Sequence, residues 1–249
     1  MKLRKKISRI LLTIFLIVVL FGAGGAMYWN SKTYPASGVA LQALQSDAQV
    51  TVTQQDGFIT FEPANMRTPI GFVFYPGAGV DYRAYAPVLH QIVAHGYFVA
   101  LVPVPLNLAF FNINAAKQVI ELYPTIQHWA VGGHSLGGIA AASFASKNPN
   151  KLDGVVFWAS YPAGIFLTNA TINVLSIYGT NDKAGMEPFD KSRTQLPADT
   201  QFVVIEGGNH AQFGSYGPQA GDKIATISPE EQWAQITEAT VLFLDSLSK

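Results

Sequence analysis

The sequence predicts an α/β fold, in which a mostly parallel central sheet carries helices on both faces. Short runs typical of strands alternate with helical patterns over most of the chain, as in consecutive strand–helix–strand units. The runs at 70–75 and 97–104 are almost continuously apolar, which is expected of strands buried on both faces. The chain has 249 residues, is 49% hydrophobic and only 13% charged, and this composition excludes a disordered chain.

The expected elements follow one another in a regular order. Residues 50–53 and 58–61 alternate apolar and polar side chains, so they are expected to form a hairpin. Apolar residues recur at helical spacing over 82–95, which indicates a helix. The other elements expected are a short helix over 39–44, strands over 129–133, 154–159, 174–178 and 202–205, and helices over 115–122, 136–146 and 188–195.

The last helix carries its own start signal. Ser228 can cap the helix, Pro229 suits its first turn, and Glu231 completes a capping box. We expect this helix to run to about residue 247.

The N-terminal segment is basic and then apolar. Residues 10–29 carry no charge and are long enough to cross the ~30 Å hydrocarbon core of a membrane as a helix. A basic flank favours the cytoplasmic side, so the rest of the chain is expected outside, held at the cell membrane by a single pass. The alternative is a cleaved signal peptide and a secreted protein, with small residues at Gly24, Gly25 and Ala26 for a protease. The flank consists of Lys2, Arg4, Lys5, Lys6 and Arg9.

The chain therefore divides into four expected parts. These are a basic cytoplasmic flank over 1–9, a transmembrane anchor or signal peptide over 10–29, a linker over 30–48 and one α/β domain over 49–249. The chain has no cysteine, so disulfides, thiolate metal sites and cysteine nucleophiles are excluded. Its formal net charge is zero, so it lacks the basic excess typical of nucleic-acid binding.

Ser135 lies in the stretch VGGHSLGG, where a strand is expected to end and a helix to begin. Gly133, Ser135 and Gly137 fit the pattern G-x-S-x-G, in which the serine occupies a sharp, strained turn and its hydroxyl projects above the sheet. Glycines on either side let the strand and the helix pass closely. The pattern predicts a nucleophilic serine, and the alternative is a tight turn in which Ser135 only caps the helix.

A nucleophilic serine needs a base that takes its proton. After such a turn the acid and the histidine follow in that order, each behind a later strand. Asp182 follows the run VLSIY and His210 follows FVVIE, so we predict Asp182 as the acid and His210 as the base. Glu206 is the competing carboxylate, and an ordinary turn-forming Asp182 with an ordinary loop His210 is the other alternative.

The oxyanion formed when a serine attacks a carbonyl needs hydrogen-bond donors. The N–H of Leu136, directly after the serine, is one expected donor. The second is expected from the stretch Pro76-Gly77-Ala78-Gly79, with Ala78 preferred and Gly79 next, unless this stretch is only a glycine-rich turn. His134 is expected to pack in the turn, no metal-binding motif is present, and this chemistry requires no cofactor.

Four stretches of the chain resemble the α/β-hydrolase superfamily. They are FYPGAGVDYRAYAP, GGHSLGG, IYGTNDKAG and IEGGNHAQFG. The likeness covers about residues 50–249 and is greatest to small single-domain bacterial serine hydrolases related to dienelactone hydrolase. It implies the nucleophile Ser135, the acid Asp182, the base His210 and an oxyanion hole near Ala78. The nucleophile of dienelactone hydrolase proper is a cysteine, so its substrate is not implied.

Together these features predict a serine hydrolase that cleaves carboxylic esters through an acyl-enzyme. The alternatives are an amidase or peptidase with the same triad, or a catalytically silent binding module. The stretch between 159 and 174 is too short for a large lid, so the site is expected to be open. The run 106–111 is either the lining of an apolar acyl pocket or ordinary core. The expected partners are a small ester or lipid-like substrate and, through residues 10–29, the membrane.

Overall fold

The computed structural model describes residues 31–55, 57–65, 68–168 and 171–248, together with positions 15, 22, 24, 25, 27 and 29. It divides into the units Met1–Thr33 and Tyr34–Lys249. The predicted basic flank over 1–9 and most of the predicted membrane segment over 10–29 lie outside the described residues. Among the described residues, no helix is both long and apolar enough to span a membrane.

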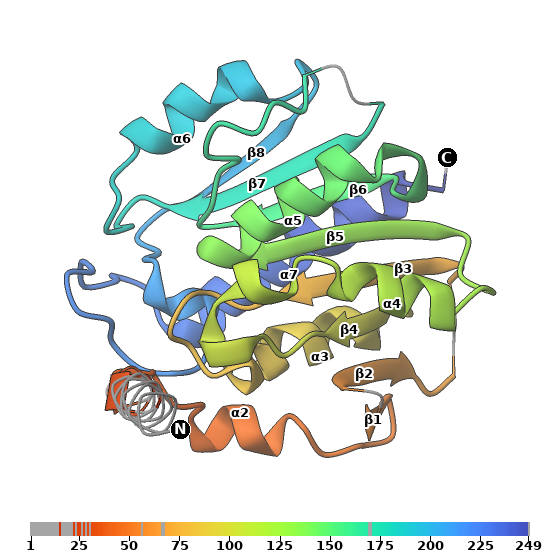
Figure 1. Cartoon of the computed structure of the whole chain (residues 1–249), viewed down its shortest axis with the longest axis horizontal. Coiled ribbons are helices and arrows are strands. Elements are labelled where there is room, and N and C mark those ends of the chain that lie inside the picture. Colours follow the sequence, from red (N-terminus) through yellow and green to blue (C-terminus); the bar gives the residue numbers. More distant parts are fainter. Residues whose placement is uncertain are drawn as a thin grey trace, which may run out of the picture. The chain divides into compact units, whose positions relative to one another are not determined.

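The second unit is built around one sheet, in which the described residues form eight strands in the order β1-β2-β4-β3-β5-β6-β7-β8 (Figure 1). β1 pairs antiparallel with β2 and β2 pairs antiparallel with β4, while all later pairings are parallel. The predicted mostly parallel sheet is therefore confirmed. The strands are β1 (Val50–Gln55), β2 (Phe58–Pro63), β3 (Ile70–Tyr75), β4 (Phe98–Leu101), β5 (His128–His134), β6 (Gly154–Trp158), β7 (Asn173–Gly179) and β8 (Gln201–Ile205).

Helices cover both faces of the sheet, and Figure 1 shows α5 in front of it and α7 behind it. The α-helices of the second unit are α2 (Gly38–Gln42), α3 (Ala86–Ala94), α4 (Ala115–Leu122), α5 (Leu136–Lys147), α6 (Glu187–Ser192) and α7 (Pro229–Ser246). Short 3-10 turns are η1 (Tyr82–Tyr85), η2 (Pro105–Asn107), η3 (Ala109–Asn112), η4 (Pro149–Lys151), η5 (Arg193–Gln195) and η6 (Ala211–Phe213).

The core lies in two layers because neighbouring residues of a strand point to opposite faces. Phe72 and Phe74 of β3 pack in one cluster with residues of α3 and α7. Val73 and Tyr75, the alternate residues of the same strand, pack in the other cluster with residues of α4 and α5. Each fully buried side chain of this kind contributes about 1.5–3 kcal/mol of burial free energy. The strand ends are thus held in place by packing on both sides.

Most elements differ from the sequence prediction by a few residues at their ends, and two of these differences have a clear structural cause. The strand expected over 97–104 is only Phe98–Leu101, and prolines at 103 and 105, which lack the N–H that a ladder needs, follow its end. The helix expected over 82–95 begins as the 3-10 turn η1, with the α-helix starting at Ala86. The capping box of α7 is present, since Glu231 N–H donates to Ser228 Oγ and Ser228 N–H donates to Glu231.

The predicted linker over 30–48 is not free chain from Tyr34 onward. Tyr34 forms a parallel bridge with Val80, and the short helix α2 buries Ala40 completely. Tyr34 and Ala36 pack against the core cluster that includes α3 and α7. The compact unit therefore starts at Tyr34 rather than at residue 49, because apolar side chains interrupt the turn-forming residues and are buried by the domain.

Candidate active site

The carboxyl ends of the parallel strands bring four separate stretches to one edge of the sheet. Tyr75 at the end of β3 pairs with Gly133 near the end of β5, and Gly179 of β7 pairs with Ile205 of β8. Each of these strands is followed directly by predicted site residues. This edge is where open α/β sheets place their ligand sites. Two of the stretches are named here: the Gly77 loop is residues 76–79, and the His210 loop is residues 206–228.

Ser135 has the strained backbone expected of it. Ser135 lies between β5 and α5 with φ of 51° and ψ of −119°. Its side chain makes no capping hydrogen bond to the helix. A Cβ at Gly137 would lie 2.2 Å from the carbonyl oxygen of Tyr75, and one at Gly133 would lie 2.4 Å from the carbonyl carbon of Gly137. The flanking glycines are therefore required by close backbone approach. Ser135 itself is partly exposed.

The backbone of Ser135 is held from the neighbouring strand β6. The N–H of Ser135 donates to the carbonyl of Trp158 at 3.0 Å. The hydroxyl of Ser160 donates to the carbonyl of Ser135 at 2.6 Å. Sequence reasoning missed Ser160, whose only signal was its place just after a strand on the same edge of the sheet. These two hydrogen bonds fix both sides of the strained residue.

Backbone strain gathers at this edge of the sheet. Among the described residues other than glycine, all those with positive φ follow β4, β5 or β6. Strain of this kind is characteristic of functional sites, because it persists only where the surrounding structure enforces it. The residues are Leu106, Asn107, Ser135, Ala159 and Ala163.

His210 and Asp182 form a buried pair. His210 Nδ1 lies 2.8 Å from Asp182 Oδ2, and their side chains are 4% and 0% exposed. A carboxylate only accepts hydrogen bonds, so Nδ1 carries the proton and the neutral imidazole presents Nε2 as an acceptor. Nε2 is buried, and among the described residues it has no hydrogen-bond partner, Ser135 included. Asp182 also forms a turn, since its Oδ1 accepts the N–H of Ala184.

Glu206, the competing carboxylate, does not contact His210. Its exposed side chain accepts a long hydrogen bond from the hydroxyl of Thr180, at 3.4 Å. Burial and a short hydrogen bond thus belong to Asp182. This difference supports the choice of Asp182 made from its position after the strand.

Two other polar side chains, those of Asp222 and Gln232, form hydrogen bonds to the backbone of the His210 loop. Asp222 accepts the N–H of Ala211 at 2.7 Å, and Gln232 of α7 both accepts the N–H of Asn209 and donates to its carbonyl. Gln232 is fully buried. Neither Asp222 nor Gln232 belongs to a recognisable motif, so sequence reasoning had no signal with which to find them. Together they position the backbone on both sides of His210.

The Gly77 loop offers one free donor. The N–H of Gly77 donates to the Tyr85 hydroxyl at 3.0 Å, and the N–H of Gly79 donates to the carbonyl of Asn107 at 2.9 Å. The N–H of Ala78 has no acceptor among the described residues, and Ala78 is partly exposed. The N–H of Leu136 opens α5, where helical N–H groups lack intrahelical partners. Of the two residues considered in this loop, Ala78 is therefore the one with an available donor.

His134 is a buried, neutral histidine. Its Nδ1 lies 2.8 Å from the hydroxyl of Tyr85, whose oxygen accepts the N–H of Gly77 and whose own hydrogen is available to Nδ1. Burial lowers the pKa of His134 well below its usual value, and the nearby cationic forms of His210 and Lys183 lower it further. Its ring centroid lies 4.4 Å from that of His210, and its ring stacks on Phe213 at 5.7 Å. His134 therefore packs in the turn, as expected, and its Nδ1 also takes part in a hydrogen bond with Tyr85.

Two segments near the site are relevant to the predicted absence of a large lid and to the predicted apolar pocket. The connection from β6 to β7 contains no helix or strand over its described positions. Leu106, Phe110 and Phe111 are 51%, 50% and 62% exposed, so they are not ordinary core. The segment that carries them adjoins the Gly77 loop through the hydrogen bond from Gly79 to Asn107. The described ranges contain no group of three or more His, Cys, Asp or Glu side chains that could hold a metal ion.

Residues 71–234 match the sequence model of a family described as the alpha/beta hydrolase family. No curated protein matches the chain. Solved structures share its fold at low identity. A dienelactone hydrolase from Anabaena variabilis is 15% identical over 79% of this chain and 99% of its own, with a TM-score of 0.61. A thermostable esterase from Pseudomonas putida is 14% identical over 83% and 87%, at 0.59, and a hyperthermophilic esterase from Pyrobaculum calidifontis is 15% identical over 82% and 89%, at 0.61.

Proposed function

The chain belongs to the alpha/beta hydrolase family, and from this premise we propose that it is a serine hydrolase that cleaves carboxylic esters through an acyl-enzyme. The observation that carries the proposal is the buried His210–Asp182 pair, whose Nε2 acceptor is left without a partner at the edge of the sheet that also holds the strained Ser135. Dienelactone hydrolases and esterases with the same fold support an ester as substrate.

The proposed reaction has two steps. In the first, Ser135 Oγ attacks the carbonyl carbon of the ester while His210 Nε2 takes the hydroxyl proton. The same proton then passes to the leaving alcohol as the carbon–oxygen bond breaks, which leaves an ester on Ser135. In the second, a water loses a proton to His210 and attacks the acyl-enzyme, and the proton returns to Ser135 as the acid is released. Asp182 keeps the imidazole in the required tautomer and stabilises its cation.

The negative charge of each tetrahedral intermediate falls on the former carbonyl oxygen. The N–H groups of Leu136 and Ala78 are the proposed donors to that oxygen, because both are available at this edge of the sheet. One such donor contributes about 2.7–4 kcal/mol of barrier lowering. The missing hydrogen bond between Ser135 and His210 agrees with the proposal, since catalytic hydrogen bonds are often long in free enzymes and shorten when substrate binds.

The proposed substrates have an apolar acyl or alcohol part. Leu106, Phe110 and Phe111 are exposed on the segment whose Asn107 carbonyl accepts the N–H of Gly79, and we propose that a chain bound at Ser135 covers them. Covering apolar surface contributes about 25 cal/mol per Å². We therefore expect kcat/KM to rise with acyl length from acetate to octanoate, and to rise less when Phe110 and Phe111 are both replaced by serine.

A fluorophosphonate probe tests the central claim. Wild-type protein is expected to be labelled, Ser135→Ala to be unlabelled, and Ser146→Ala, which changes an exposed serine farther along the same helix α5, to be labelled like wild type. A matched panel of p-nitrophenyl esters and p-nitroanilides then separates an esterase from an amidase. Folded wild-type protein without any labelling would favour a binding module and end the proposal.

We further propose that residues 10–29 direct the domain out of the cytoplasm, either as a membrane anchor or as a cleaved signal. The support is the uncharged apolar run behind a basic flank. Periplasmic reporter activity of a fusion at residue 249, together with N-terminal sequencing of the mature chain, tests both forms. Reporter activity confined to the cytoplasm contradicts both.

A further inference from the structure

A short stretch of chain ahead of α2 touches both loops of the proposed site. This stretch, residues 34–37, is called the strap. On one side it pairs with the chain that continues the Gly77 loop: Tyr34 N–H donates to the carbonyl of Gly79 at 2.7 Å, and Asp81 N–H donates to the carbonyl of Tyr34 at 2.9 Å. Gly79 is covalently next to Ala78, the proposed oxyanion donor. The strap therefore fixes the backbone immediately beside that donor.

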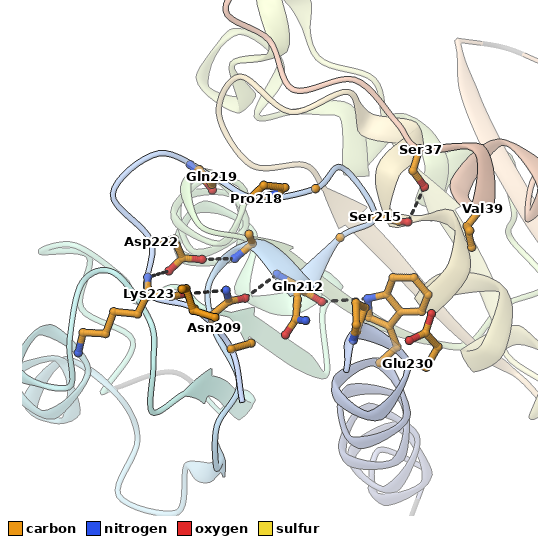
Figure 2. A pocket seen from close by; sticks show the side chains of 17 residues that line it. Ser37, Val39, Asn209, Gln212, Ser215, Pro218, Gln219, Asp222, Lys223 and Glu230 are labelled. Carbon is orange, nitrogen blue, oxygen red and sulfur yellow. Dashed lines mark hydrogen bonds between the residues drawn. The ribbon is translucent and has the colours of Figure 1, made fainter. Parts of the chain in front are cut away.

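On its other side the strap holds the His210 loop. Ser37 N–H donates to the carbonyl of Ser215 at 2.8 Å, and the two serine hydroxyls are hydrogen-bonded at 2.6 Å (Figure 2). The N–H of Ala220 donates to the hydroxyl of Tyr34 at 3.1 Å, and the ring of Tyr34 lies 5.7 Å from that of Tyr216. Backbone, hydroxyl and ring contacts thus all bind the loop that carries His210.

The His210 loop is buried against the core through Ala211, Phe213 and Tyr216, and elsewhere it borders a cavity. A cavity of about 520 Å³ lies behind the loop, between it and the start of α7 (Figure 2). A hollow of this size removes the close contacts that would otherwise fix a backbone in one position. The loop is held across this side by specific hydrogen bonds instead. The cavity is lined by, among others, Ser37, Ser215, Gln219, Asp222 and Trp233.

The strap itself has a firm anchor. Ser37 is the N-cap of α2 and accepts the N–H of Ala40 at 3.2 Å, and Ala40 is fully buried. Tyr34 and Ala36 pack against the core. The strap therefore cannot be displaced unless its packing against the core and its hydrogen bond to α2 are also lost. Because the strap is packed on the core and hydrogen-bonded to both loops, it can hold both loops in fixed positions relative to the core.

We propose that the strap sets the distance between the oxyanion donor on the Gly77 loop and the base on the His210 loop, with Tyr34 and Ser37 as positioning residues. The inference rests on the proposed function, because the proposed function is what places an oxyanion donor on the Gly77 loop and a base on the His210 loop. Tyr34 and Ser37 act through the loops and not on the substrate. Loss of strap contacts is expected to slow acylation of Ser135 while the fold stays intact.

Tyr34→Ala tests the proposal, and Tyr123→Ala is its matched control. Tyr123 is also half-buried and packs on Phe98, with ring centroids 4.3 Å apart, at the start of β4 and so at the opposite end of the strands. The second-order rate of fluorophosphonate labelling at Ser135 is expected to fall about ten-fold or more in Tyr34→Ala. The control is expected to stay within about two-fold of wild type, although both variants lose comparable packing. Tyr34→Phe keeps the ring and is expected to recover most of the rate.

Amide hydrogen exchange gives a readout that does not depend on activity. Faster exchange at 77–81 and 210–216 in Tyr34→Ala, without the same change in Tyr123→Ala, supports the strap as a positioning element. Equal labelling rates and equal exchange in the two variants overturn it, even when wild-type protein is labelled at Ser135. Wild-type protein that is not labelled contradicts the proposed function instead, and the exchange result then decides the proposal for the strap.

Discussion

The hydroxyl of Tyr85 lies 2.8 Å from Nδ1 of His134 and accepts the N–H of Gly77 at 3.0 Å. One phenol therefore ties the Gly77 loop to the residue directly before Ser135. A Cβ at Gly77 would lie 2.7 Å from His134 Nδ1 and 2.9 Å from the Tyr85 hydroxyl, so only glycine fits between them. Burial raises the pKa of Tyr85, which keeps the phenol protonated and able to donate. The connection couples the two proposed oxyanion donors.

Tyr85→Phe is expected to weaken both the fold and catalysis. The change leaves the Gly77 N–H and His134 Nδ1 without partners inside the protein, at a cost of about 1–3 kcal/mol for each. It also frees the Gly77 loop, so kcat is expected to fall about ten-fold, which is less than the loss of a whole oxyanion donor. Urea denaturation and ester kinetics measure the two effects.

Tyr97→Phe is the control for that variant. The Tyr97 hydroxyl donates to Asp245 at the far end of α7, so its loss is expected to lower stability and leave kcat unchanged. A Tyr85→Phe enzyme with wild-type kcat would show that the connection has no part in positioning the donor.

The stability of the protein is expected to fall as the pH drops below about 6.5, and His134 is one cause. Burial holds the pKa of His134 well below its usual value. As the pH falls below about 6.5, His134 therefore becomes protonated in the unfolded chain while it stays neutral in the folded chain. Between the two pKa values the free energy of unfolding falls by up to about 1.4 kcal/mol for each pH unit. Above pH 6.5 both states are neutral and the effect vanishes.

His134→Asn removes this proton and keeps an acceptor near the Tyr85 hydroxyl. Urea denaturation from pH 5 to 8 is expected to show a shallower loss of stability at low pH for His134→Asn than for wild type. Parallel curves for the two proteins would exclude His134 as a source of the pH dependence.

Asp182→Asn is expected to lower kcat by on the order of 10³–10⁴-fold with little change in fold. An amide at this position can donate to Nδ1 and so favour the tautomer that presents an N–H to Ser135 in place of an acceptor. The matched variant Asp190→Asn changes an exposed carboxylate on α6 that pairs with Arg193. Its kcat is expected to equal that of wild type, as measured on a p-nitrophenyl ester. Similar kinetics for both variants would remove Asp182 from the mechanism.

Gly137→Ala is expected to destabilise the domain by about 3 kcal/mol or more, because the new methyl group meets backbone that cannot move aside. Its Cβ would lie 2.2 Å from the carbonyl oxygen of Tyr75 and 2.6 Å from that of Pro76. Gly38→Ala is the control, since a Cβ there has no atom within 4 Å, and its stability is expected to change by less than about 1 kcal/mol. Thermal or urea unfolding decides. Equal stabilities in the pair would mean that the close approach at the turn is not limiting.

The elements of the sheet could be predicted because their signals are local. Continuous apolar runs identified β3 and, over too long a stretch, β4, and the capping residues identified the start of α7 at Pro229. The error in the length of β4 came from extending an apolar run past its prolines. Ser135, Asp182 and His210 could be placed because each follows a strand, and parallel strands end at one edge.

The residues that hold the site could not be predicted. Ser160, Asp222 and Gln232 carry no motif, and their partners lie 25, 11 and 23 residues away in the sequence. Tyr85 was recognised only as an apolar residue at helical spacing, since spacing does not reveal what a hydroxyl will meet. The sequence predicts a linker over the strap because Pro35 and the small residues after it are typical of turns, while Ser215, the partner of Ser37, lies 178 residues away.

The α/β class, the order of strands and helices, and the serine, carboxylate and histidine that follow three of the strands could all be predicted from the amino-acid sequence. These depend on side-chain periodicity and turn chemistry, which act over a few residues and so are legible along the chain. Three features come from the tertiary fold: Asp182 rather than Glu206 is hydrogen-bonded to His210, the N–H of Ala78 has no acceptor among the described residues, and Tyr85 and the strap join the loops. Those contacts form where separate segments of the fold pack together. Side-chain patterns along the chain do not show which segments will lie next to each other.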